Sequence, residues 1–383
     1  MESWQYSLET GILPPSHSIS YLRLIPKTDK DGTKLSNWRP ITLSNCDHKL
    51  ITRVYNKRLL AILGKHIIQT QTAYIKQRNI TDNIRMIKSA IQLANHERHI
   101  NGSVIALDAQ KAFDSISHQY LAEVLDRVGL NNFNPILSLL YRNLKNDIIV
   151  NGEVKGRHSV TNGVKQGDAL SCTLFILGIE PLIRNIQNNN QIVPIKSRTL
   201  QYEWPKVFGY ADDITCVVLN NDTSKQQIFT EYERFTKFAG LKLNADKTEI
   251  YCFDGNNRVQ HGLTNITYLE ENVNIIPKES IKVNGIELCQ NLRTLRRLNA
   301  EKLLAKMDRH FKQWAKRHLS LLGKVQIYKT FGLSQFLYHL SVFEPDTQIW
   351  KEISVRINKF MWNRNYQGNQ APHRIKKRYF ITT

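Results

Sequence analysis

The sequence predicts an α+β fold, in which a small antiparallel sheet is backed by helices and is followed by a basic helical region. Two observations support the sheet. A continuous apolar run over residues 104–107 is typical of a central strand, and apolar segments on both sides of residues 209–213 indicate a hairpin. From residue 292 onward, apolar residues recur at helical spacing among many Lys and Arg residues. We therefore expect a mixed body and a helical C-terminal part.

The predicted hairpin carries two adjacent carboxylates, Asp212 and Asp213, at its tip. Adjacent carboxylates between apolar strands repel each other and lose solvation, and a bound divalent cation would remove both penalties. When the pair is taken alone, an acidic turn without a ligand is the favoured explanation, because Asp is common in turns. Asp108, at the end of the apolar run, supplies a third carboxylate if the strands lie side by side. Two-metal phosphoryl transfer requires such a set.

The charge of the chain is unevenly distributed. The 383 residues carry a formal net charge of +20, which favours an acidic polymer as the partner. Residues 291–383 hold 19 Lys and Arg against 5 Asp and Glu, a net of +14, and the remaining 290 residues have a net of only +6. This split is typical of a catalytic body with a basic nucleic-acid-binding region, although a merely solvated basic face would give the same count.

The cysteine and hydropathy patterns indicate the redox compartment and whether a membrane is a partner. The five cysteines lie far apart and show no zinc-binding spacing, so we expect buried free thiols in a reducing compartment. No apolar run is expected to reach membrane-spanning length, and the N-terminus lacks a basic-then-apolar signal pattern. These features predict a protein without a membrane partner.

The N-terminal part contains two predicted strands joined by a polar loop. Residues 21–27 form a strand that ends at proline, and residues 37–41 resume extended structure after Gly32. The arrangement brings Lys27 and Arg39 close together, and paired cations suit a triphosphate because Arg binds as a fork and Lys as a point charge. Two unrelated surface cations are the alternative interpretation.

Several helices are predicted from periodicity and capping residues. Residues 47–63 form one helix, and residue 81 or 82 caps the next. Ser117 caps a third helix, and a fourth ends at Gly240. The predicted apolar members of the first helix are Leu50, Ile51, Val54, Leu59 and Ile62.

A glycine-bearing loop over residues 162–171 opens an apolar helix. Gly163 and Gly167 allow the backbone to approach a ligand closely, and Gln166 between them could hydrogen-bond a nucleotide. A plain loop-to-helix junction explains the same residues without a ligand.

Five sequence blocks follow one another along the chain. They are Ile25-Pro26-Lys27 with Asn37-Trp38-Arg39-Pro40-Ile41, Leu107-Asp108 with Lys111-Ala112-Phe113-Asp114, Gly163-Val164 with Gln166-Gly167-Asp168 and Leu170-Ser171, Tyr210-Ala211-Asp212-Asp213, and Gly240-Leu241-Lys242-Leu243-Asn244 with Lys247-Thr248. Together and in this order, the blocks resemble the reverse transcriptase domain of LINE-type, non-LTR retrotransposons. The resemblance covers about residues 22–251 and continues more weakly to residue 362.

The resemblance implies a right-hand polymerase fold and an RNA-directed DNA polymerase. Residues 1–21 would form a lead-in, residues 22–289 the fingers and palm with the fingers mainly in 22–99, and residues 290–383 a basic helical thumb and tail. The implied partners are an RNA template, a DNA primer and dNTPs, with two Mg²⁺ ions as cofactors and Mn²⁺ as an alternative ion. The implied location is the nucleus and cytoplasm. The sequence indicates no oligomeric state.

The resemblance also assigns roles to individual residues. It implies metal-binding catalytic carboxylates, a general acid, a nucleotide site and thumb contacts to the nucleic-acid backbone. Phe113 would be the gate that clashes with a 2′-hydroxyl. The carboxylates are Asp108, Asp212 and Asp213, the acid is Lys247, the nucleotide site comprises Lys27, Arg39, Phe113, Gln166, Gly167 and Tyr210, and the thumb contacts are Lys302, Lys306, Arg309 and Lys312.

Departures from the family pattern leave alternatives open. Ala169 and Cys172 stand where members often have proline, and an unusually long polar stretch, residues 254–279, precedes the expected primer grip near residues 282–286. The basic run at residues 374–378 could be a nuclear signal or a phosphate-binding tail. The chain could be a fragment of a longer element protein.

Two rivals remain for the activity. One is an RNA-copying viral polymerase or an intron-encoded maturase, and the aromatic residue Phe113 argues against an enzyme that makes RNA. The other is a degenerate element copy that binds nucleic acid without activity. The intact carboxylates argue against that second rival.

Overall fold

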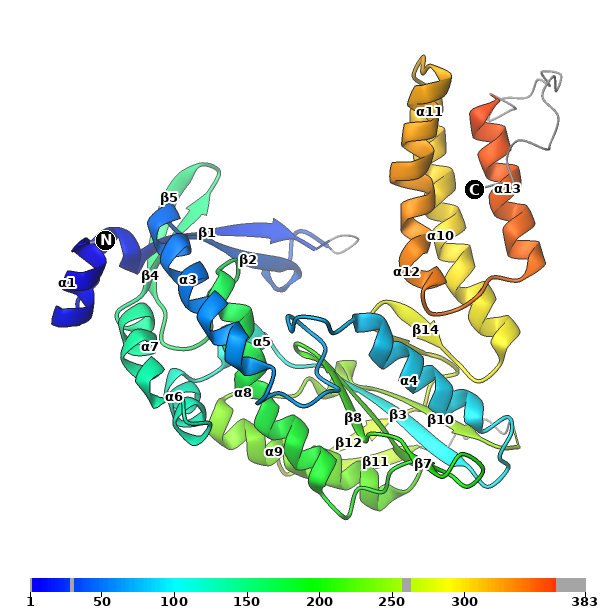
Figure 1. The fold of residues 1–383 in the computed structure, drawn as a ribbon, viewed down its shortest axis with the longest axis horizontal. Helices are drawn as coiled ribbons and strands as arrows, with labels where there is room; N and C mark the ends of the chain where they lie inside the picture. The colour runs from blue at the N-terminus through cyan, green and yellow to red at the C-terminus, as the bar shows by residue number, and fades with distance from the viewer. Residues whose placement is uncertain (1, 28–30, 257–262, 363–383) are drawn as a thin grey trace. The chain divides into compact units, whose positions relative to one another are not determined.

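The chain divides into two compact units, Met1–Asn284 and Gly285–Thr383. The computed structural model (Figure 1) describes residues 2–27, 31–256 and 263–362. The unit boundary lies five residues before the predicted start of the thumb at residue 290. The basic run at residues 374–378 lies outside the described residues.

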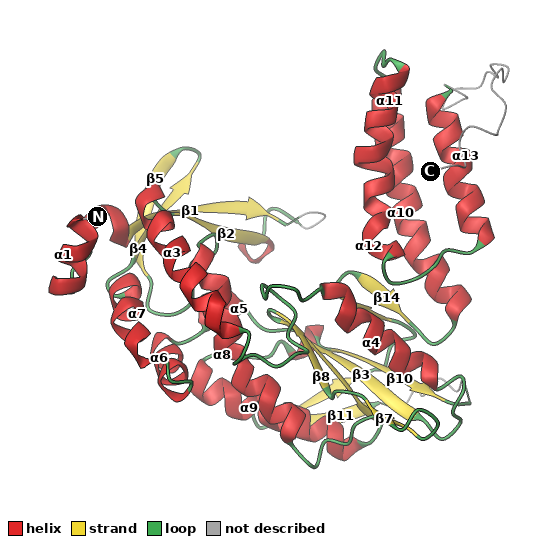
Figure 2. Ribbon diagram, in the orientation of Figure 1, coloured by secondary structure: helices red, strands yellow, loops and turns green. Residues whose placement is uncertain are grey.

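The first unit mixes helices and strands throughout its length (Figure 2). In chain order its elements are α1 (Glu2–Thr10), α2 (Pro15–Ser18), β1 (Ile19–Pro26), η1 (Leu35–Asn37), β2 (Trp38–Leu43), α3 (Cys46–Leu63), α4 (Ile80–Leu93), β3 (Asn101–Leu107), α5 (Ala112–Ser115), α6 (His118–Arg127), η2 (Asn131–Phe133), α7 (Asn134–Tyr141), β4 (Lys145–Val150), β5 (Glu153–Ser159), α8 (Ala169–Asn188), β6 (Lys196–Ser197), β7 (Tyr202–Glu203), β8 (Val207–Tyr210), β9 (Asp213–Leu219), α9 (Asp222–Ala239), η3 (Ala245–Lys247), β10 (Glu249–Asp254), β11 (Thr264–Tyr268), β12 (Glu271–Ile275) and β13 (Ile281–Val283).

The second unit is dominated by helices among its described residues. Its elements are β14 (Ile286–Leu288), α10 (Leu292–Ala315), α11 (Leu321–Ile327), the π-helical turn η4 (Tyr328–Leu333), α12 (Ser334–Leu340) and α13 (Thr347–Met361). The prediction of a helical C-terminal part from residue 292 is confirmed, with η4 joining α11 to α12. Phe311 of α10 stacks on Phe360 of α13 with ring centroids 4.3 Å apart, at the centre of this unit's own core.

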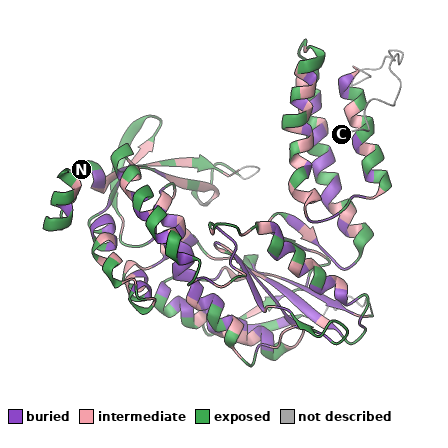
Figure 3. Cartoon of the chain, viewed as in Figure 1, coloured by how far each residue is buried: buried purple, intermediate pink, exposed green. Residues whose placement is uncertain are grey.

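A four-stranded antiparallel sheet in the order β10-β3-β9-β8 forms the centre of the first unit. Successive side chains of its strands point to opposite faces of the sheet, and both faces are buried (Figure 3). The strands are therefore apolar at nearly every position. Ile105, Ile214 and Ile250 face the main core with α8 and α9. Helix α4 lies beside β8, close to the opposite face (Figure 1). The predicted α+β class with a small antiparallel sheet is confirmed.

A second sheet is built from the N-terminal strands and a later hairpin, in the order β2-β1-β4-β5. β1 pairs antiparallel with β2 and parallel with β4, and β4 pairs antiparallel with β5. Val150 and Glu153 are the last paired residues of the β4–β5 hairpin, which turns at Asn151 and Gly152. Strand β5 is exposed along its whole length and forms one edge of this sheet.

The predicted apolar face of the first long helix is confirmed only in part: Leu59 is buried and Ile51 packs against the core, but the other three predicted members are exposed. In α3 the side chains of Leu50, Val54 and Ile62 are 66%, 46% and 40% exposed. The buried face instead includes two polar residues, His48 and Thr52. These are buried because they serve the carboxylate of a neighbouring loop, described below, and such a partner overrides the apolar periodicity.

Helix α8 corrects the expectation about apolar runs. Its 20 residues are long and apolar enough to span a membrane by length and composition, so the prediction that no run reaches this length is wrong. In the structure, 72% of its apolar window is buried inside the protein. A helix that is packed on all sides is apolar all round, and α8 is such a core helix.

The helix starts confirm some predicted caps and correct another. The hydroxyl of Ser117 accepts a hydrogen bond from the Tyr120 backbone N–H, as predicted. Helix α4 is capped by Asn79, with Asp82 completing the capping box, whereas the prediction named residue 81 or 82 as the cap. The five cysteines are free thiols, and Cys216, Cys252 and Cys289 are buried.

Candidate active site

Asp108 follows the last residue of β3, at the middle of the central sheet. Leu107 is paired with Ile214 of β9, so the next residues outward on the two strands are Asp108 and Asp213. Antiparallel pairing therefore brings carboxylates that are more than one hundred positions apart in sequence to the same end of the sheet. This is the convergence that the sequence predicted.

The turn between β8 and β9 carries Asp212 at its tip. Tyr210 and Asp213 are paired, which leaves Ala211 and Asp212 as the two turn residues. Ala211 adopts a left-handed backbone conformation with φ of 56°. A residue with a Cβ atom is uncommon in this region, so the turn has to be held by its surroundings.

A buried glutamine supplies that support. The Gln71 side-chain oxygen accepts hydrogen bonds from the backbone N–H of Ala211 and of Ala73, both at 3.1 Å. The Gln71 side-chain nitrogen also lies 3.5 Å from the Ala211 carbonyl oxygen. Gln71 is completely buried, and the chain passes β8 so closely that a Cβ atom on Gly209 would lie 2.8 Å from the Gln71 amide nitrogen. The position needs glycine because of this approach.

Asn83 of α4 also supports the strand that leads to the turn. Its amide nitrogen donates to the carbonyl oxygens of Thr70 and Gly209 at 2.7 and 3.0 Å. The backbone of Thr72 donates to the Gly209 carbonyl, and Gly209 donates to the Thr70 carbonyl. Residues 70–73, together with Asn83, therefore brace the strand that ends at the carboxylate turn.

The pKa values of Asp212 and Asp213 are both raised above their ordinary value. Burial is the main factor that raises the pKa of Asp213 to about 6, and the charges of Asp212 and Asp108 raise it further. Burial and the charge of Asp108 also raise the pKa of Asp212 above its ordinary value. Desolvation and like-charge repulsion therefore both disfavour the ionised form of these carboxylates. A cation or a cationic ligand would relieve this unfavourable energy.

Lys247 lies beside the first carboxylate. Its Nζ is 3.7 Å from Oδ2 of Asp108, and both side chains remain accessible, at 66% and 42% exposure. The segment that carries Lys247 runs along the backbone after β3, because Asn244 donates to the Asp108 carbonyl and Gln110 donates to the Lys242 carbonyl. The structure therefore brings together four predicted residues: Asp108, Asp212, Asp213 and Lys247.

The three carboxylates offer oxygen donors for a divalent cation. Among the residues that the structure describes, no group of three or more His, Cys, Asp or Glu side chains is arranged as a metal-binding cluster. The donor set nevertheless suits Mg²⁺, which takes oxygen ligands and is commonly held by one or two carboxylates together with substrate phosphates. The raised pKa values of Asp212 and Asp213, to which the charge of Asp108 contributes in both cases, are the observation that supports this fit. Metal binding by the three carboxylates stays a prediction.

Asp114, to which the sequence assigned no role, follows Phe113 and binds Gln166. The ring of Phe113 stacks on Phe175 with centroids 4.4 Å apart, at the edge of the core. The Gln166 amide nitrogen donates to both oxygens of Asp114 at 3.0 Å. Burial raises the pKa of Asp114, while the Gln166 hydrogen bond and the charge of Lys111 oppose that rise. Asp114 therefore orients the predicted nucleotide ligand Gln166.

The glycine-bearing loop also contacts the N-terminal sheet. The backbone N–H of Thr42 donates to the Gln166 carbonyl at 3.0 Å. Gly167 has a φ of 108°, and a Cβ atom there would lie 3.0 Å from the Thr42 carbonyl oxygen. Glycine is required at this position by both the backbone conformation and the close approach.

A buried polar network anchors the end of the loop. Lys165 is 6% exposed, burial lowers its pKa to about 8, and its Nζ donates to the Ser20 hydroxyl at 3.2 Å. Asp168 caps α8 and lies 2.9 Å from Nε2 of His48. Burial raises the pKa of Asp168, but the hydrogen bonds from His48 and Thr52 outweigh it and leave the pKa below its ordinary value. This network explains the polar buried face of α3.

The two predicted triphosphate ligands lie on the N-terminal sheet. Arg39 is paired with Ile25, and the Lys27 backbone donates to the Asn37 carbonyl just beyond the paired residues. Alternation along the strand puts the Lys27 and Arg39 side chains on the same face of the hairpin. The structure brings this pair together. Their role in triphosphate binding stays a prediction.

The remaining predicted ligands are Tyr210 and four basic residues of α10. Tyr210 ends β8 next to the carboxylate turn and is half-buried. On α10 the predicted thumb residues all lie on the exposed side of the helix, opposite the buried Leu303, Met307 and Phe311. The thumb residues are Lys302, Lys306, Arg309 and Lys312.

One of these thumb lysines already has a partner. Lys302 Nζ lies 2.8 Å from Oε1 of Glu287. Its positive charge is therefore partly neutralised within its own unit, and we expect Lys302 to contribute less to phosphate binding than Lys306, Arg309 and Lys312.

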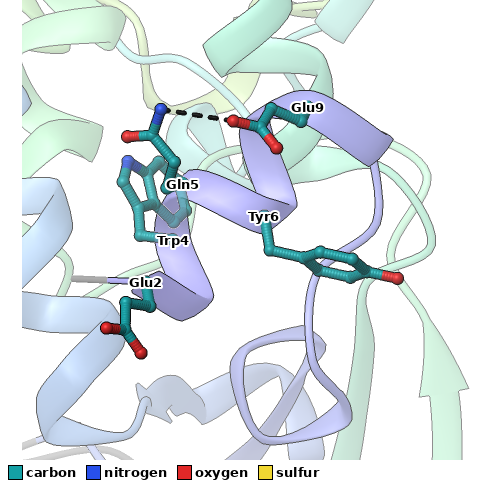
Figure 4. Close-up of a pocket in the computed structure, with 5 residues that line it drawn as sticks. All are labelled: Glu2, Trp4, Gln5, Tyr6 and Glu9. Atoms are coloured by element: carbon teal, nitrogen blue, oxygen red, sulfur yellow. Dashed lines mark hydrogen bonds between the residues drawn. The ribbon is translucent and has the colours of Figure 1, made fainter.

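A small pocket lies away from the carboxylates. It has a volume of about 390 Å³ and is formed against α1 (Figure 4). Its lining residues are Glu2, Trp4, Gln5, Tyr6 and Glu9. None of the predicted site residues lines it.

Comparison with known proteins places the chain in a family. Residues 25–288 match the model of the family described as reverse transcriptase (RNA-dependent DNA polymerase). The chain is 25% identical over 366 residues to the transposon TX1 uncharacterized 149 kDa protein of Xenopus laevis, covering 93% of this chain and 26% of that protein. It is 29% identical over 246 residues to a retrovirus-related Pol polyprotein from type-1 retrotransposable element R2 of Popillia japonica, covering 64% of this chain and 33% of that protein.

A solved structure is also similar. Apo telomerase from Candida tropicalis, truncated from its C-terminal domain, matches 74% of this chain and 55% of that chain with a TM-score of 0.47 and 14% identity. The chain spans about a quarter to a third of the length of the curated relatives described above. The family match covers most of the chain, and the relatives come from the mobile elements that the sequence blocks indicated. The chain belongs to the reverse transcriptase (RNA-dependent DNA polymerase) family.

Proposed function

We propose that the chain is the RNA-directed DNA polymerase of a non-LTR retrotransposon, which adds dNTPs to a DNA primer on an RNA template. One observation carries the proposal: Asp108 and the Asp212–Asp213 turn meet at one end of the central sheet, with Lys247 beside Asp108. Family membership and the retrotransposon relatives support the same activity.

The reaction joins the primer 3′-oxygen to the α-phosphorus of the nucleotide, breaks the bond to the β-phosphate and releases pyrophosphate. Asp108, Asp212 and Asp213 would hold two Mg²⁺ ions, or Mn²⁺ in their place. When bound, such ions acidify the attacking hydroxyl and neutralise the phosphates. The carboxylates must be ionised for this role, and the raised pKa of Asp213 makes that role sensitive to pH.

Lys247 would donate the proton that the leaving pyrophosphate takes up. Its ammonium group lies 3.7 Å from Asp108, at the edge of the carboxylate site, and it is accessible to a bound nucleotide. General acid catalysis requires the donor to reach the leaving group, and an exposed, flexible side chain on a fixed segment meets that requirement.

The nucleotide would be bound by groups from three parts of the first unit. Lys27 and Arg39 would contact the triphosphate from the N-terminal sheet, and Gln166 with Gly167 would approach the nucleotide from the loop before α8. Phe113 and Tyr210 would complete the sugar and base contacts. The contact between this loop and Thr42 supports the proposal, because it connects the sheet that carries Arg39 to the loop that carries Gln166.

The second unit would hold the template–primer. Exposed Lys and Arg side chains on α10 are suited to phosphate contacts, which give affinity without sequence preference. The free cysteines are compatible with a reducing location, and we propose the nucleus and cytoplasm. The intact carboxylates and their supporting contacts argue against an inactive element copy.

Primer extension on an RNA template with Mg²⁺ and four dNTPs tests the proposal. We expect extension that requires both the RNA template and the divalent ion, with dNTPs strongly preferred over rNTPs. A DNA template of the same sequence and an incubation with EDTA are the controls. Purified, folded protein that binds the template–primer but never extends it would indicate the inactive copy instead.

A further inference from the structure

The polar stretch that separates this chain from its family pattern contains an ordered hairpin. Strands β11 and β12 pair antiparallel over residues 264–275 and turn at Leu269 and Glu270, both with positive φ. Along β11 the side chains of Thr264, Ile266 and Tyr268 are buried, while the intervening ones are exposed. The buried side chains of the hairpin alternate with exposed polar ones, which is why the stretch is polar in overall composition.

The hairpin is attached to α9 at defined points. The Gln226 side chain exchanges two hydrogen bonds of 2.9 Å with the backbone of Thr267, one with its N–H and one with its carbonyl. The ring of Tyr268 contacts the rings of Phe229 and Tyr232 with centroids 6.3 and 6.4 Å apart. These contacts fix both the register and the depth of β11 on the helix.

The chain beyond the hairpin is attached to β10. Lys278 donates its backbone N–H to the Ile250 carbonyl at 2.8 Å and pairs through Nζ with Glu249. The segment 240–248 joins α9 to β10 and carries Lys247. Residues 264–278 therefore contact both α9 and β10, the two elements at the ends of the segment 240–248.

The hydroxyl of Tyr268 contacts this segment directly. The backbone N–H of Leu243 donates to the Tyr268 hydroxyl oxygen at 2.9 Å. Tyr268 OH also lies 3.2 Å from Thr236 Oγ1, which itself donates to the Leu241 carbonyl at 2.6 Å. Because the Thr236 hydroxyl has a single proton, Tyr268 donates to Thr236 and accepts from Leu243. The phenol thus uses one capacity on Leu243 of the segment and the other on Thr236 of α9, which in turn bonds Leu241.

The opposite side of Leu243 faces the active site. Gln110 donates its side-chain amide to the Leu243 carbonyl at 3.2 Å, and the next residue, Asn244, donates to the Asp108 carbonyl at 2.7 Å. Leu243 is only 2% exposed, so without Tyr268 its N–H would be buried without a partner. The segment would then shift, and the shift would be passed on through Asn244 to Lys247.

We propose that the β11–β12 hairpin is a positioning element for the active site, in which the Tyr268 hydroxyl holds Leu243 so that Lys247 stays beside Asp108. The inference rests on the proposed polymerase activity, with Lys247 as the proton donor. Tyr268 itself touches no reacting atom and acts through the backbone of residues 243–247.

The substitution Tyr268→Phe removes only the hydroxyl and keeps the ring. In single-turnover incorporation of one dNTP on an RNA template, we expect the maximal rate to fall about tenfold or more, with the dNTP dissociation constant unchanged. In a Lys247→Ala background the same substitution should cause no further loss, because the group that it positions is gone. If the two losses multiply instead, the proposal is overturned.

Tyr232→Phe is the matched control. Tyr232 belongs to the same aromatic cluster and is 1% exposed, and its hydroxyl is buried with no hydrogen-bond partner among the described residues. We expect its removal to leave the rate unchanged. An equal loss in Tyr232→Phe would show that packing of the cluster, and not the Tyr268 hydroxyl, sets the rate, and would overturn the proposal.

Amide hydrogen exchange tests the hydrogen bond between Leu243 and Tyr268 without any catalysis. The Leu243 amide should exchange slowly in the wild type and in Tyr232→Phe, and faster in Tyr268→Phe. Unchanged exchange at Leu243 in Tyr268→Phe overturns the proposal whether or not the chain polymerises. A wild-type chain that fails to extend a primer overturns the proposed function separately.

Discussion

The carboxylate turn and the basic helix α10 differ in how the protein surrounds their charged side chains. At the turn, Asp212 and Asp213 sit between buried strands, and Gln71 and Asn83 satisfy the surrounding backbone with buried hydrogen bonds. On α10, Lys306 and its basic neighbours lie on the exposed side of an amphipathic helix, and only the apolar side is packed.

This difference predicts two kinds of response to substitution. Around the turn each group depends on several others, so removing one should change the chemistry by orders of magnitude. On α10 each charge acts through solvent, so its removal should change affinity by a modest increment that adds to the others. We expect the effects to decrease from the carboxylates to the residues that support them and then to the sugar gate.

Asp108→Ala should produce the largest loss. Removal of one of the three carboxylates leaves the phosphates without part of their charge stabilisation, and we expect the extension rate to fall more than about a hundredfold, equivalent to ~2.7 kcal/mol. Binding of template–primer should remain. The exposed carboxylate of Asp246, next to Lys247 in sequence, gives the control variant Asp246→Ala, which should extend normally. Extension by Asp108→Ala at more than about a hundredth of the wild-type rate, on this same scale, would contradict the assignment.

Gln71→Met should come next, although Gln71 is not proposed to touch the substrate. The substitution leaves the N–H groups of Ala211 and Ala73 without their partner, so the turn should lose its fixed geometry. We expect the rate to fall by about 10- to 100-fold and the free energy of unfolding by about 2–4 kcal/mol. Gln92→Met is the control, because the buried Gln92 amide nitrogen has no hydrogen-bond partner among the described residues. Equal rates in the two variants would show that Gln71 does not position the turn.

Phe113→Val tests the sugar gate. Removing the ring should remove the clash with a 2′-hydroxyl and raise the ratio of rNTP to dNTP incorporation by about tenfold or more, or ~1.4 kcal/mol. Phe113 also stacks on Phe175, so the variant should lose some stability. Phe175→Leu disturbs the same stack from the core side and serves as the control, with an unchanged ratio expected. A ratio that rises equally in both variants would assign Phe113 to packing alone.

Asp213→Asn should raise stability, in the opposite direction to the loss of activity expected for a metal-binding carboxylate. Because burial and the neighbouring carboxylates raise the folded-state pKa of Asp213 to about 6 from 3.8, its ionised form opposes folding. This unfavourable contribution is fully present above pH about 6 and disappears as the pH falls through 6 toward the ordinary value. In EDTA the variant should therefore melt at a higher temperature than the wild type at pH 8. The two should converge near pH 4, and a lower Tm for the variant at pH 8 would count against the repulsion.

The strands of the site were predictable because their signals are local. The run Val104–Ile105 and the residues around Ile214 are apolar in continuous stretches, and buried central strands have that composition. The position of Lys247 was predicted only through the family resemblance, since no local pattern relates it to Asp108. The structure brings these two residues to 3.7 Å.

The residues that support the site could not be predicted, because their partners are distant in the sequence. Gln71 appears in the sequence as part of a polar connection, and its partner Ala211 lies 140 positions away. His48 and Thr52 interrupt the apolar pattern of α3 because they are buried against Asp168, which comes from another part of the chain. A polar residue that is buried for a distant partner looks like a surface residue until the partner is known.

The central claim is that the carboxylate turn carries the chemistry and that α10 carries affinity for the nucleic-acid backbone. Two variants separate these roles. One is Asp212→Asn, and the other reverses the four exposed charges of α10, Lys302, Lys306, Arg309 and Lys312. Reversal of Arg234 and Lys237 on α9 is the control, since each is already paired with a glutamate.

Single-turnover extension at saturating template–primer, combined with binding titrations across several salt concentrations, measures both properties in each variant. We predict that Asp212→Asn keeps its affinity and salt dependence but loses extension by more than about a hundredfold. The α10 variant should keep its rate at saturation, bind more weakly and show a shallower log–log salt slope, by about 0.9 for each duplex phosphate that is no longer bound. A salt slope in the α10 variant equal to that of the wild type, or an Asp212→Asn variant that still extends the primer, would contradict the claim.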